Sequence, residues 1–229
     1  MTQKVHETAI IHPGAELGQD VAIGPYCIIE ENVRLGDRTR LDSYVQVKNG
    51  STIGADNHIY SFTNIGDDPQ HLVHPGKDCE VVIGDHNTIR EYVTVHRGTE
   101  GFDRVTRIGS HCMLMAYVHI AHDCILEDHV IFANSVMLAG HVIVGNHATI
   151  GGITGVHQFT RIGDYAFLGA TSGLNQDLPP YMLAGGYRAS LQGLNLIGLR
   201  RHGFSREVIS ALKKAYAIIW RSELPRKEA

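Results

Sequence analysis

Residues 108–168 decide the fold of this chain, and they read IGSHCMLMAYVHIAHDCILEDHVIFANSVMLAGHVIVGNHATIGGITGVHQFTRIGDYAFL. A large apolar residue returns at every sixth position of this stretch: Ile108, Leu114, Ile120, Leu126, Phe132, Leu138, Val144, Ile150, Val156, Ile162 and Leu168. Neither a helix, with a period of about 3.6, nor a strand, with a period of about 2, gives such a repeat. A hexapeptide repeat predicts a parallel β-helix, in which each hexapeptide forms one short strand and one bend.

The residue two places before each large apolar residue is small or β-branched. These residues are Thr106, Cys112, Val118, Cys124, Val130, Val136, Val142, Ala148, Thr154, Thr160 and Ala166. Such side chains suit a tight interior beside a bend. Three hexapeptides close one triangular coil of about 18 residues, and successive coils stack about 4.8 Å apart. Each coil buries its apolar residues only against the next coil, so the stretch must form one rod.

The same period extends towards the N-terminus. It runs through Leu17, Ile23, Ile29, Leu35, Leu41, Val47, Ile53, Ile59 and Ile65, and again through Ile83, Ile89 and Val95. Polar segments near 67–80 and 97–105 interrupt it. We expect loop insertions there, because insertions in a repeat array lie on one face and often bind ligands. One β-helix domain is therefore expected over residues 1–187.

After Leu168 the period fades and the composition becomes helical. We expect Pro179–Pro180 to end the rod and residues 188–229 to form a short C-terminal α-helical segment. One helix is expected over about 191–201 and a second over 205–221, N-capped by its first residue, a serine. The apolar face of the second helix would comprise Val208, Ile209, Leu212, Ala215, Tyr216 and Ile219.

Charge is unevenly distributed along the chain. The net charge of −4 argues against a general nucleic-acid binder. From Arg188 to the end there are nine Lys or Arg residues against three Glu, whereas the preceding part has 11 basic and 21 acidic residues. A basic tail on an acidic body predicts the docking of an anionic partner, although a solvated helix surface would have the same composition.

The apolar runs and the cysteine positions indicate the cellular compartment. No apolar run approaches the roughly 18 residues that a membrane span needs, and no secretory leader is recognisable. Cys27, Cys112 and Cys124 fall on the small interior position of the hexapeptide, so we expect buried free thiols there. The expectation is a cytoplasmic protein without a membrane span.

Six residues are expected to gather at one corner of the rod, and His119, three residues before His122, is expected to border the same surface. Residues one coil apart, about 18 positions, lie one above the other. This spacing places His122 beside Gly140 and Asp123 beside His141. The whole set is His119, His122, Asp123, Gly140, His141, His157 and Gln158.

Two chemistries fit this corner. A neutral His122 oriented by the carboxylate of Asp123 is the usual general base near neutral pH, and the N–H of Gly140 could hold an oxyanion. A zinc site of three His and a water, as in hydratases on a similar rod, would need no carboxylate beside the central His. A non-catalytic solenoid that binds or scaffolds would need no polar cluster. The adjacent carboxylate favours acyl transfer.

Six segments resemble one enzyme family: IREYVTVHRGT from Ile89, HIAHDC from His119, LAGHV from Leu138, GGITGVHQF from Gly151, QDLPPY from Gln176 and GLRRHGFSRE from Gly198. They are similar to the UDP-N-acetylglucosamine O-acyltransferases, cytoplasmic enzymes that open lipid A and hence lipopolysaccharide synthesis. The resemblance implies a left-handed parallel β-helix, and a homotrimer with active sites between neighbouring subunits. It implies no metal and no cofactor. The acyl donor would be a 3-hydroxyacyl chain on acyl carrier protein, an acidic partner for the basic tail, and the acceptor a UDP-amino sugar.

The resemblance also implies a role for each residue. His122 would deprotonate the 3-hydroxyl of the sugar, Asp123 would orient His122, and the N–H of Gly140 would hold the thioester oxyanion. Ala170 falls where the family sets acyl-chain length through side-chain size. Substrate contacts are implied for a further set, of which the last two would meet the nucleotide: His119, His141, His157, Gln158, Asn195 and Arg201.

Four positions depart from the family pattern, namely His71, Val73, Ile197 and His202. In familiar members these positions border the sugar nucleotide. Acylation of a 3-amino analogue, or of another nucleotide sugar, therefore stays an alternative.

Overall fold

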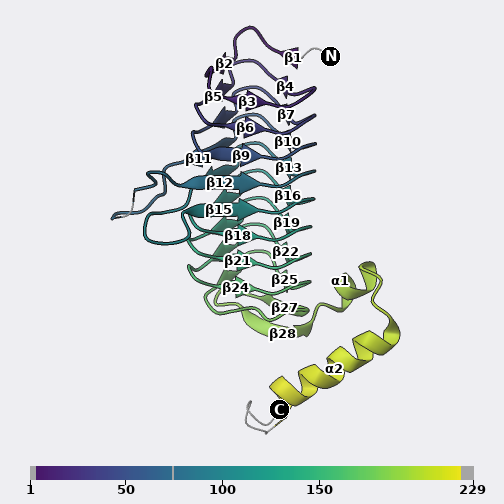
Figure 1. Ribbon diagram of the computed structural model, residues 1–229. Coiled ribbons are helices and arrows are strands. Elements are labelled where there is room, and N and C mark those ends of the chain that lie inside the picture. Colours follow the sequence, from purple (N-terminus) through teal and green to yellow (C-terminus); the bar gives the residue numbers. More distant parts are fainter. Residues whose placement is uncertain (1–3, 74, 223–229) are drawn as a thin grey trace.

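The computed structural model describes residues 4–73 and 75–222, which form a rod of short strands followed by two helices (Figure 1). The strands make three sheets, and the chain visits these sheets in rotation. Each coil therefore adds one strand to each sheet, and the strands of successive coils pair in parallel. The parallel β-helix predicted from the repeat is confirmed.

The strand bounds follow the hexapeptide. The first sheet contains β1 (Lys4–Val5), β4 (Ala22–Ile23), β7 (Arg40–Leu41), β10 (His58–Ile59), β13 (Thr88–Ile89), β16 (Met113–Leu114), β19 (Ile131–Phe132), β22 (Thr149–Ile150), β25 (Phe167–Leu168), β27 (Met182–Gly185) and β28 (Ser190–Leu194). The second contains β2 (Ile10–Ile11), β5 (Ile28–Ile29), β8 (Gln46–Val47), β11 (Asn64–Asp67), β14 (Thr94–His96), β17 (His119–Ile120), β20 (Met137–Leu138), β23 (Gly155–Val156) and β26 (Gly173–Leu174). The third contains β3 (Glu16–Leu17), β6 (Arg34–Leu35), β9 (Ser51–Ile53), β12 (Glu80–Ile83), β15 (Val105–Ile108), β18 (Ile125–Leu126), β21 (Ile143–Val144) and β24 (Arg161–Ile162).

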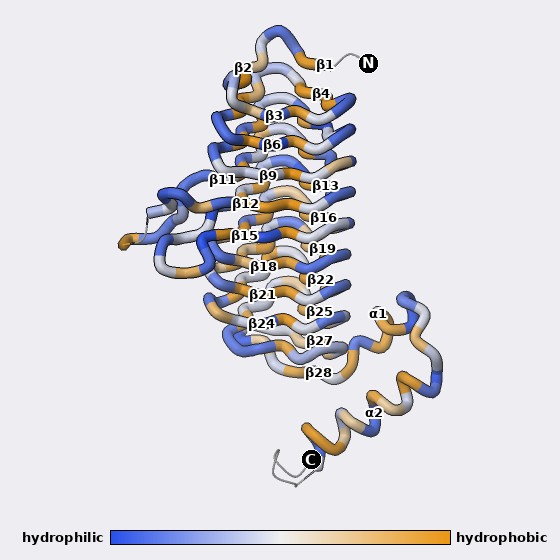
Figure 2. The backbone as a smooth tube through the Cα atoms, viewed as in Figure 1, coloured by the Kyte–Doolittle hydropathy of each residue, from blue (hydrophilic) through white to orange (hydrophobic). Residues whose placement is uncertain are grey.

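An offset of 18 residues relates neighbouring coils in the central stretch, where His119 pairs with Met137 and Ile120 with Leu138. The second residue of each short strand points inward. From Ile108 to Leu168 the large apolar residues of the repeat are at most 3% exposed, and the small residues two places earlier are at most 4% exposed. Figure 2 shows the result as hydrophobic bands that recur down the rod. Both interior positions are buried, as the repeat predicts.

Each corner in the central part of the rod contains a residue in the left-handed backbone conformation, which is unfavourable for any residue other than glycine. Non-glycine residues with φ near +60° recur every six positions from Tyr117 to Thr171. A left-handed φ costs a non-glycine residue roughly 1–2 kcal/mol. Stacking of equivalent corners offsets this cost, since for example the rings of Tyr44 and Phe62 lie 5.0 Å apart and nearly parallel.

Two loops leave the rod on one side, where the repeat is interrupted (Figure 1). One connects β11 to β12 and the other connects β14 to β15, although Asp67, Glu80 and Val105 at the edges of the expected insertions belong to strands. Arg97 joins the loops. Its Nε donates to the carbonyl of Gly66 at 2.8 Å, and it lies 3.7 Å from the carboxylate of Asp68.

The C-terminal end differs from the prediction in two respects. Pro179–Pro180 does not end the rod, because β27 follows it and pairs in parallel with β25. The helix expected over 191–201 begins only at Leu196, because 190–194 forms β28 and pairs antiparallel with β27. Gly193 has a φ of +133°, which no α-helix accommodates. The domain boundary between residues 1–187 and 188–229 stays a prediction. Strand β28 lies on the C-terminal side of this boundary, in the segment that was expected to be helical.

Two helices follow β28, α1 (Leu196–Arg201) and α2 (Arg206–Arg221). Ser205 caps α2 as expected, since its Oγ accepts a hydrogen bond from the N–H of Val208. Of the predicted apolar face Ile209 is buried, whereas Val208 is 45% exposed. Residues 223–229 of the expected helical segment lie outside the described residues. Within the described part of the chain, no helix is long and apolar enough to cross a membrane.

Removal of one interior side chain should destabilise the rod. Leu35 is 2% exposed, so we expect Leu35→Ala to lower the free energy of unfolding by about 2–5 kcal/mol through the cavity it leaves. Its neighbour Arg34 makes a surface ion pair with Glu16 at 3.1 Å, and Arg34→Ala should cost at most about 1 kcal/mol. Denaturant unfolding of both variants measures the difference, and equal losses would contradict the assigned inward and outward faces.

Candidate active site

His122 and Asp123 occupy the corner between β17 and β18, and Gly140 and His141 occupy the corresponding corner of the next coil. The backbone N–H of His141 donates to the carbonyl of His122 at 3.0 Å, which holds the two corners together. The offset of 18 thus brings His122 against Gly140 and Asp123 against His141.

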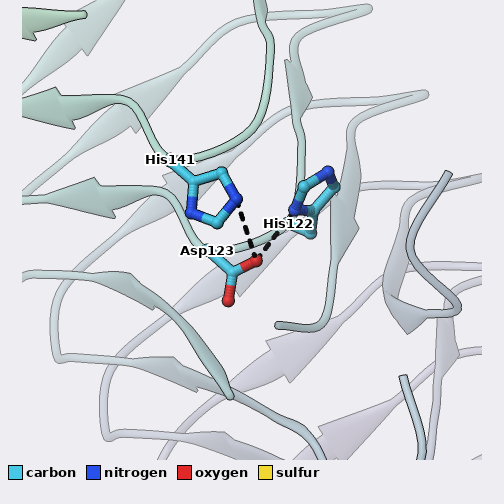
Figure 3. Close-up of side chains that lie close together, drawn as sticks. All are labelled: His122, Asp123 and His141. Carbon is cyan, nitrogen blue, oxygen red and sulfur yellow. Dashed lines mark hydrogen bonds and ion pairs between the residues drawn. The ribbon is translucent and has the colours of Figure 1, made fainter. Parts of the chain in front are cut away.

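The carboxylate of Asp123 is the centre of this corner (Figure 3). Its Oδ2 lies 2.8 Å from Nδ1 of His122 and 3.7 Å from Nε2 of His141. The two imidazole rings meet edge to face, with centroids 5.1 Å apart. His122 and Asp123 are both buried. Since an ionised carboxylate only accepts hydrogen bonds, Nδ1 of His122 carries the proton, and Nε2 is left as a proton acceptor.

Thr99 also holds Asp123, and the sequence did not predict this. The N–H of Thr99 donates to Oδ1 at 3.0 Å, and its hydroxyl donates to Oδ2 at 2.7 Å. Burial of Asp123 raises the pKa of its carboxyl, but the hydrogen bonds from His122 and Thr99 outweigh burial and hold the pKa below its usual value. Asp123 is therefore ionised at neutral pH. In the sequence, Thr99 could have been noticed only because it ends the family-like segment IREYVTVHRGT, at the start of the second loop.

Gly140 packs directly on the ring of His122. A Cβ at this position would lie 2.4 Å from Cε1 and 2.7 Å from Nε2 of His122, so only glycine fits. Among the described residues, nothing accepts a hydrogen bond from the N–H of Gly140. This N–H is therefore a free donor beside the acceptor nitrogen of His122.

A groove of about 960 Å³ opens over the second sheet beside this corner. Five of the seven corner residues line it: His119, His122, Gly140, His157 and Gln158. The first loop borders it through residues 70–73, and Tyr187 and Arg188 border it from the C-terminal end. Much of the remaining wall is apolar, with Met137 55% exposed. Such a groove suits an elongated ligand with one apolar part.

His119 lies on the groove wall as a neutral imidazole. Burial, followed by the neighbouring imidazoles of His96 and His122, lowers its pKa to about 4. Its Nδ1 lies 2.8 Å from the hydroxyl of Thr94. At neutral pH this side chain can therefore offer a hydrogen bond to a ligand but no charge.

Asp123 and His141 line a second, smaller cavity of about 310 Å³ on the other side of the corner. The rings of Phe102 and Phe159 both pack against that of His141, with centroids 4.3 and 4.6 Å away. Burial lowers the pKa of His141, which keeps this imidazole neutral. The seven corner residues therefore divide between two cavities. Asp123 and His141 line the smaller cavity, and the other five line the groove.

Three further predicted residues lie away from the groove within one chain. Ala170 is exposed after β25, at the opposite edge of the second sheet from His122. Asn195 caps α1, where its Oδ1 accepts from the N–H of Gly198 and its Nδ2 donates to the carbonyl of Tyr165. Arg201 ends α1, which Figure 1 places on the side of the rod away from the loops.

The four positions that depart from the family pattern divide into two pairs. His71 and Val73 border the groove, and the ring of His71 meets that of His122 edge to face at 5.3 Å. Ile197 is 65% exposed on α1, and His202 packs edge-on against His147 and Tyr165. Only the first pair can touch a ligand of the groove in the same chain.

The corner also bears on the zinc alternative. One ligand atom each from His122, Asp123 and His141 lies within 4.8 Å of the others, which is close enough for a metal ion. However, Oδ2 of Asp123 already receives donors from His122 and Thr99. A carboxylate beside the central histidine is what the general-base interpretation requires, so the geometry favours a base at His122.

Two family models match parts of the chain. One, described as Udp N-acetylglucosamine O-acyltransferase, Domain 2, matches residues 177–229. The other, described as bacterial transferase hexapeptide (six repeats), matches residues 106–140.

Curated relatives match nearly the whole chain. The acyl-[acyl-carrier-protein]–UDP-N-acetylglucosamine O-acyltransferase of Thermodesulfovibrio yellowstonii is 52% identical over 99% of this chain and 88% of its own length. The enzyme of the same name from Halorhodospira halophila is 50% identical over 96% of this chain and 86% of its own.

Solved structures agree with the curated relatives. The UDP-N-acetylglucosamine O-acyltransferase of Moraxella catarrhalis superposes with a TM-score of 0.97 at 46% identity, covering 99% of this chain and 88% of that one. LpxA from Acinetobacter baumannii gives a TM-score of 0.96 at 44% identity, with the same coverage. The rod is accordingly the left-handed parallel β-helix that the resemblance implied.

A methyl group at Gly140 should displace His122. We expect Gly140→Ala to move the imidazole and lengthen the 2.8 Å separation between its Nδ1 and Oδ2 of Asp123, because the new Cβ would overlap the ring. Gly155→Ala is the matched control, since a Cβ there meets nothing within 4 Å. Crystal structures of both variants test this, and an unmoved ring in Gly140→Ala would contradict the assigned packing.

His119 should stay neutral far into the acid range. Its folded pKa of about 4 lies below the ordinary value of about 6.5, so folding favours the neutral form. The stability that this represents is complete above about pH 6.5 and is lost as the pH falls towards 4. Histidine-selective NMR titration, with His119→Gln to assign the signal, measures the midpoint. A midpoint near 6.5 would refute the buried environment.

Proposed function

Because this chain belongs to the UDP-N-acetylglucosamine O-acyltransferase family, we propose that it moves a 3-hydroxyacyl group from acyl carrier protein to the 3-position of UDP-N-acetylglucosamine. This reaction would open lipid A synthesis in the cytoplasm. One observation carries the mechanism: Nδ1 of His122 is held by Asp123 at 2.8 Å while its ring borders the groove. This arrangement suits a general base oriented by a carboxylate.

The proposed reaction is a direct acyl transfer. Nε2 of His122 removes the proton from the 3-hydroxyl as that oxygen attacks the thioester carbonyl carbon. The N–H of Gly140 stabilises the oxyanion of the tetrahedral intermediate. The intermediate collapses with cleavage of the carbon–sulfur bond, and His122 returns the proton to the departing thiolate of the carrier. Throughout, the ionised Asp123 stabilises the transient imidazolium.

The groove supplies the substrate contacts in this proposal. His119, His157 and Gln158 line the same groove as His122 and offer hydrogen bonds to the sugar or to the donor. The apolar part of the wall suits an acyl chain. His141 would contact substrate from the adjoining corner. No resident cofactor takes part, since the acyl group arrives activated as a thioester.

Neighbouring copies of the chain would complete the site. Ala170, Asn195 and Arg201 lie away from the groove of their own chain, and a homotrimer with sites between subunits would let a neighbour supply them. Exposed apolar side chains on the rod agree with such packing, since Ile153 is 70% exposed and Met137 55% exposed. In that assembly Ala170 would limit the length of the acyl chain.

The basic C-terminal segment would dock the carrier. Its cations include Arg200, Arg201, Arg206, Lys213 and Lys214, which lie on α1 and α2. A strongly acidic carrier protein would be steered to such a surface by complementary charge.

A second acceptor is favoured by one observation. His71 and Val73 border the groove, and the His71 ring packs against His122, where a different polar group is common in the family. An amine at the sugar 3-position would need the same base, so a UDP-3-amino analogue of N-acetylglucosamine is the alternative acceptor.

The test is acyl transfer from 3-hydroxyacyl carrier protein to each acceptor. Turnover of either one should fall by about 10²-fold or more in His122→Ala, as expected for the loss of a positioned base, while the thermal unfolding midpoint stays near that of the wild type. His129→Ala is the control, because His129 stacks between His111 and His147 on another corner. Absence of turnover with both acceptors would refute the proposal and favour a non-catalytic solenoid.

A further inference from the structure

The second loop occupies the corner against which the site stacks. In the regular part of the rod the offset between coils is 18 residues, but Thr94 of β14 pairs with His119 of β17, an offset of 25. Seven extra residues therefore lie between β14 and β15, directly next to the corner of His122 and Asp123.

The neck of this loop is fixed. A Cβ on Gly98 would lie 2.2 Å from the nitrogen of Val105, so the two ends of the loop touch and only glycine fits between them. The N–H of Gly98 donates to the carbonyl of Glu80, and the N–H of Glu80 donates to the carbonyl of Arg104. These bonds tie the loop to the strand β12 of the preceding coil.

Thr99 projects from the neck onto Asp123 and is 0% exposed. Its N–H holds Oδ1 at 3.0 Å and its hydroxyl holds Oδ2 at 2.7 Å, so both carboxylate oxygens are anchored from one residue. Rotation of the carboxylate would break both hydrogen bonds, and buried partners cannot be replaced by bulk water. The oxygen that receives the Thr99 hydroxyl is the same one that receives Nδ1 of His122.

Phe102 keeps the far end of the loop on the same corner. Its ring centroid lies 4.3 Å from that of His141, which also stacks on Phe159 at 4.6 Å. The loop is thus seated at its neck by backbone bonds and at its tip by a ring contact.

We propose that Thr99 is a positioning residue for the general base, which it acts on through Asp123. The proposal rests on the proposed function, in which His122 is that base. Thr99 fixes the plane of the carboxylate, the carboxylate fixes the tautomer and direction of the His122 imidazole, and the inserted loop exists at this corner to deliver Thr99. Thr99 itself touches neither substrate.

Thr99→Val is the principal variant, because valine keeps the shape of threonine and removes only the hydroxyl donor. With the hydroxyl donor gone, Oδ2 keeps only Nδ1 of His122 as a partner, so the carboxylate should turn and misdirect the imidazole. A misplacement of about 1 Å can cost on the order of 10²-fold in rate, so we expect kcat to fall at least about tenfold. The KM values of donor and acceptor should stay within about twofold, since Thr99 lies off the groove. Thr99→Ser, which restores the hydroxyl, should recover most of the lost kcat.

Thr39→Val is the matched control. Thr39 is also 0% exposed, and its hydroxyl also donates a 2.7 Å hydrogen bond, to the carbonyl of Gly54 in the next coil. Both residues lie far along the rod from Asp123. It should lose stability comparably and keep wild-type kcat. A fall of kcat in both variants to the same extent would show a general loss of folding and overturn the proposal.

A double-mutant cycle tests the route through Asp123. If Thr99 acts only through this carboxylate, Thr99→Val should slow Asp123→Asn by less than about twofold. Full additivity of the two effects would overturn the proposal, as would an unchanged kcat when Thr99→Val is made in an active enzyme.

A crystal structure of Thr99→Val tests the proposal without any measurement of turnover: a rotated Asp123 carboxylate supports the proposal, and an unmoved one refutes it. An inactive wild type would refute only the proposed function.

Discussion

The parallel hydrogen-bond ladder between successive coils is the constraint on which this structure depends. Because each strand pairs with the strand one coil away, residues 18 positions apart are held in contact along the regular part of the rod. The ladder buries the two interior positions of every hexapeptide and stacks every corner on its neighbour. A single repeating interaction thus supplies both the core and the positions of the exposed side chains.

The site uses this regularity and also breaks it. Stacking alone brings His122 onto Gly140 and Asp123 onto His141, so a base, a carboxylate and a free backbone donor meet on the same left-handed corners that recur along the rod. The opposite neighbour of the same corner is irregular, because the loop between β14 and β15 replaces it and delivers Thr99 to Asp123. The repeat places the reacting groups, and the insertion fixes their orientation.

A single chain holds only part of the proposed site. The groove over the second sheet is open on its outer side, while α1 with Asn195 and Arg201 lies on the other side of the rod. In the proposed trimer this separation has a simple reason, since a rigid rod cannot fold back on its own groove and a neighbouring rod can cover it.

Periodicity determined the β-helix, its interior residues and the pairing of His122 with Gly140 and of Asp123 with His141, because a fixed offset converts spacing in the sequence directly into contact. The family motifs added the residues of α1 and the handedness. Tertiary structure alone decided the rest. Strand β28 formed where a helix was expected, because the edge of β27 offered unpaired backbone groups and Gly193 adopted a non-helical φ. Likewise Thr99 reached Asp123 through an insertion, and no repeat specifies where an inserted loop folds.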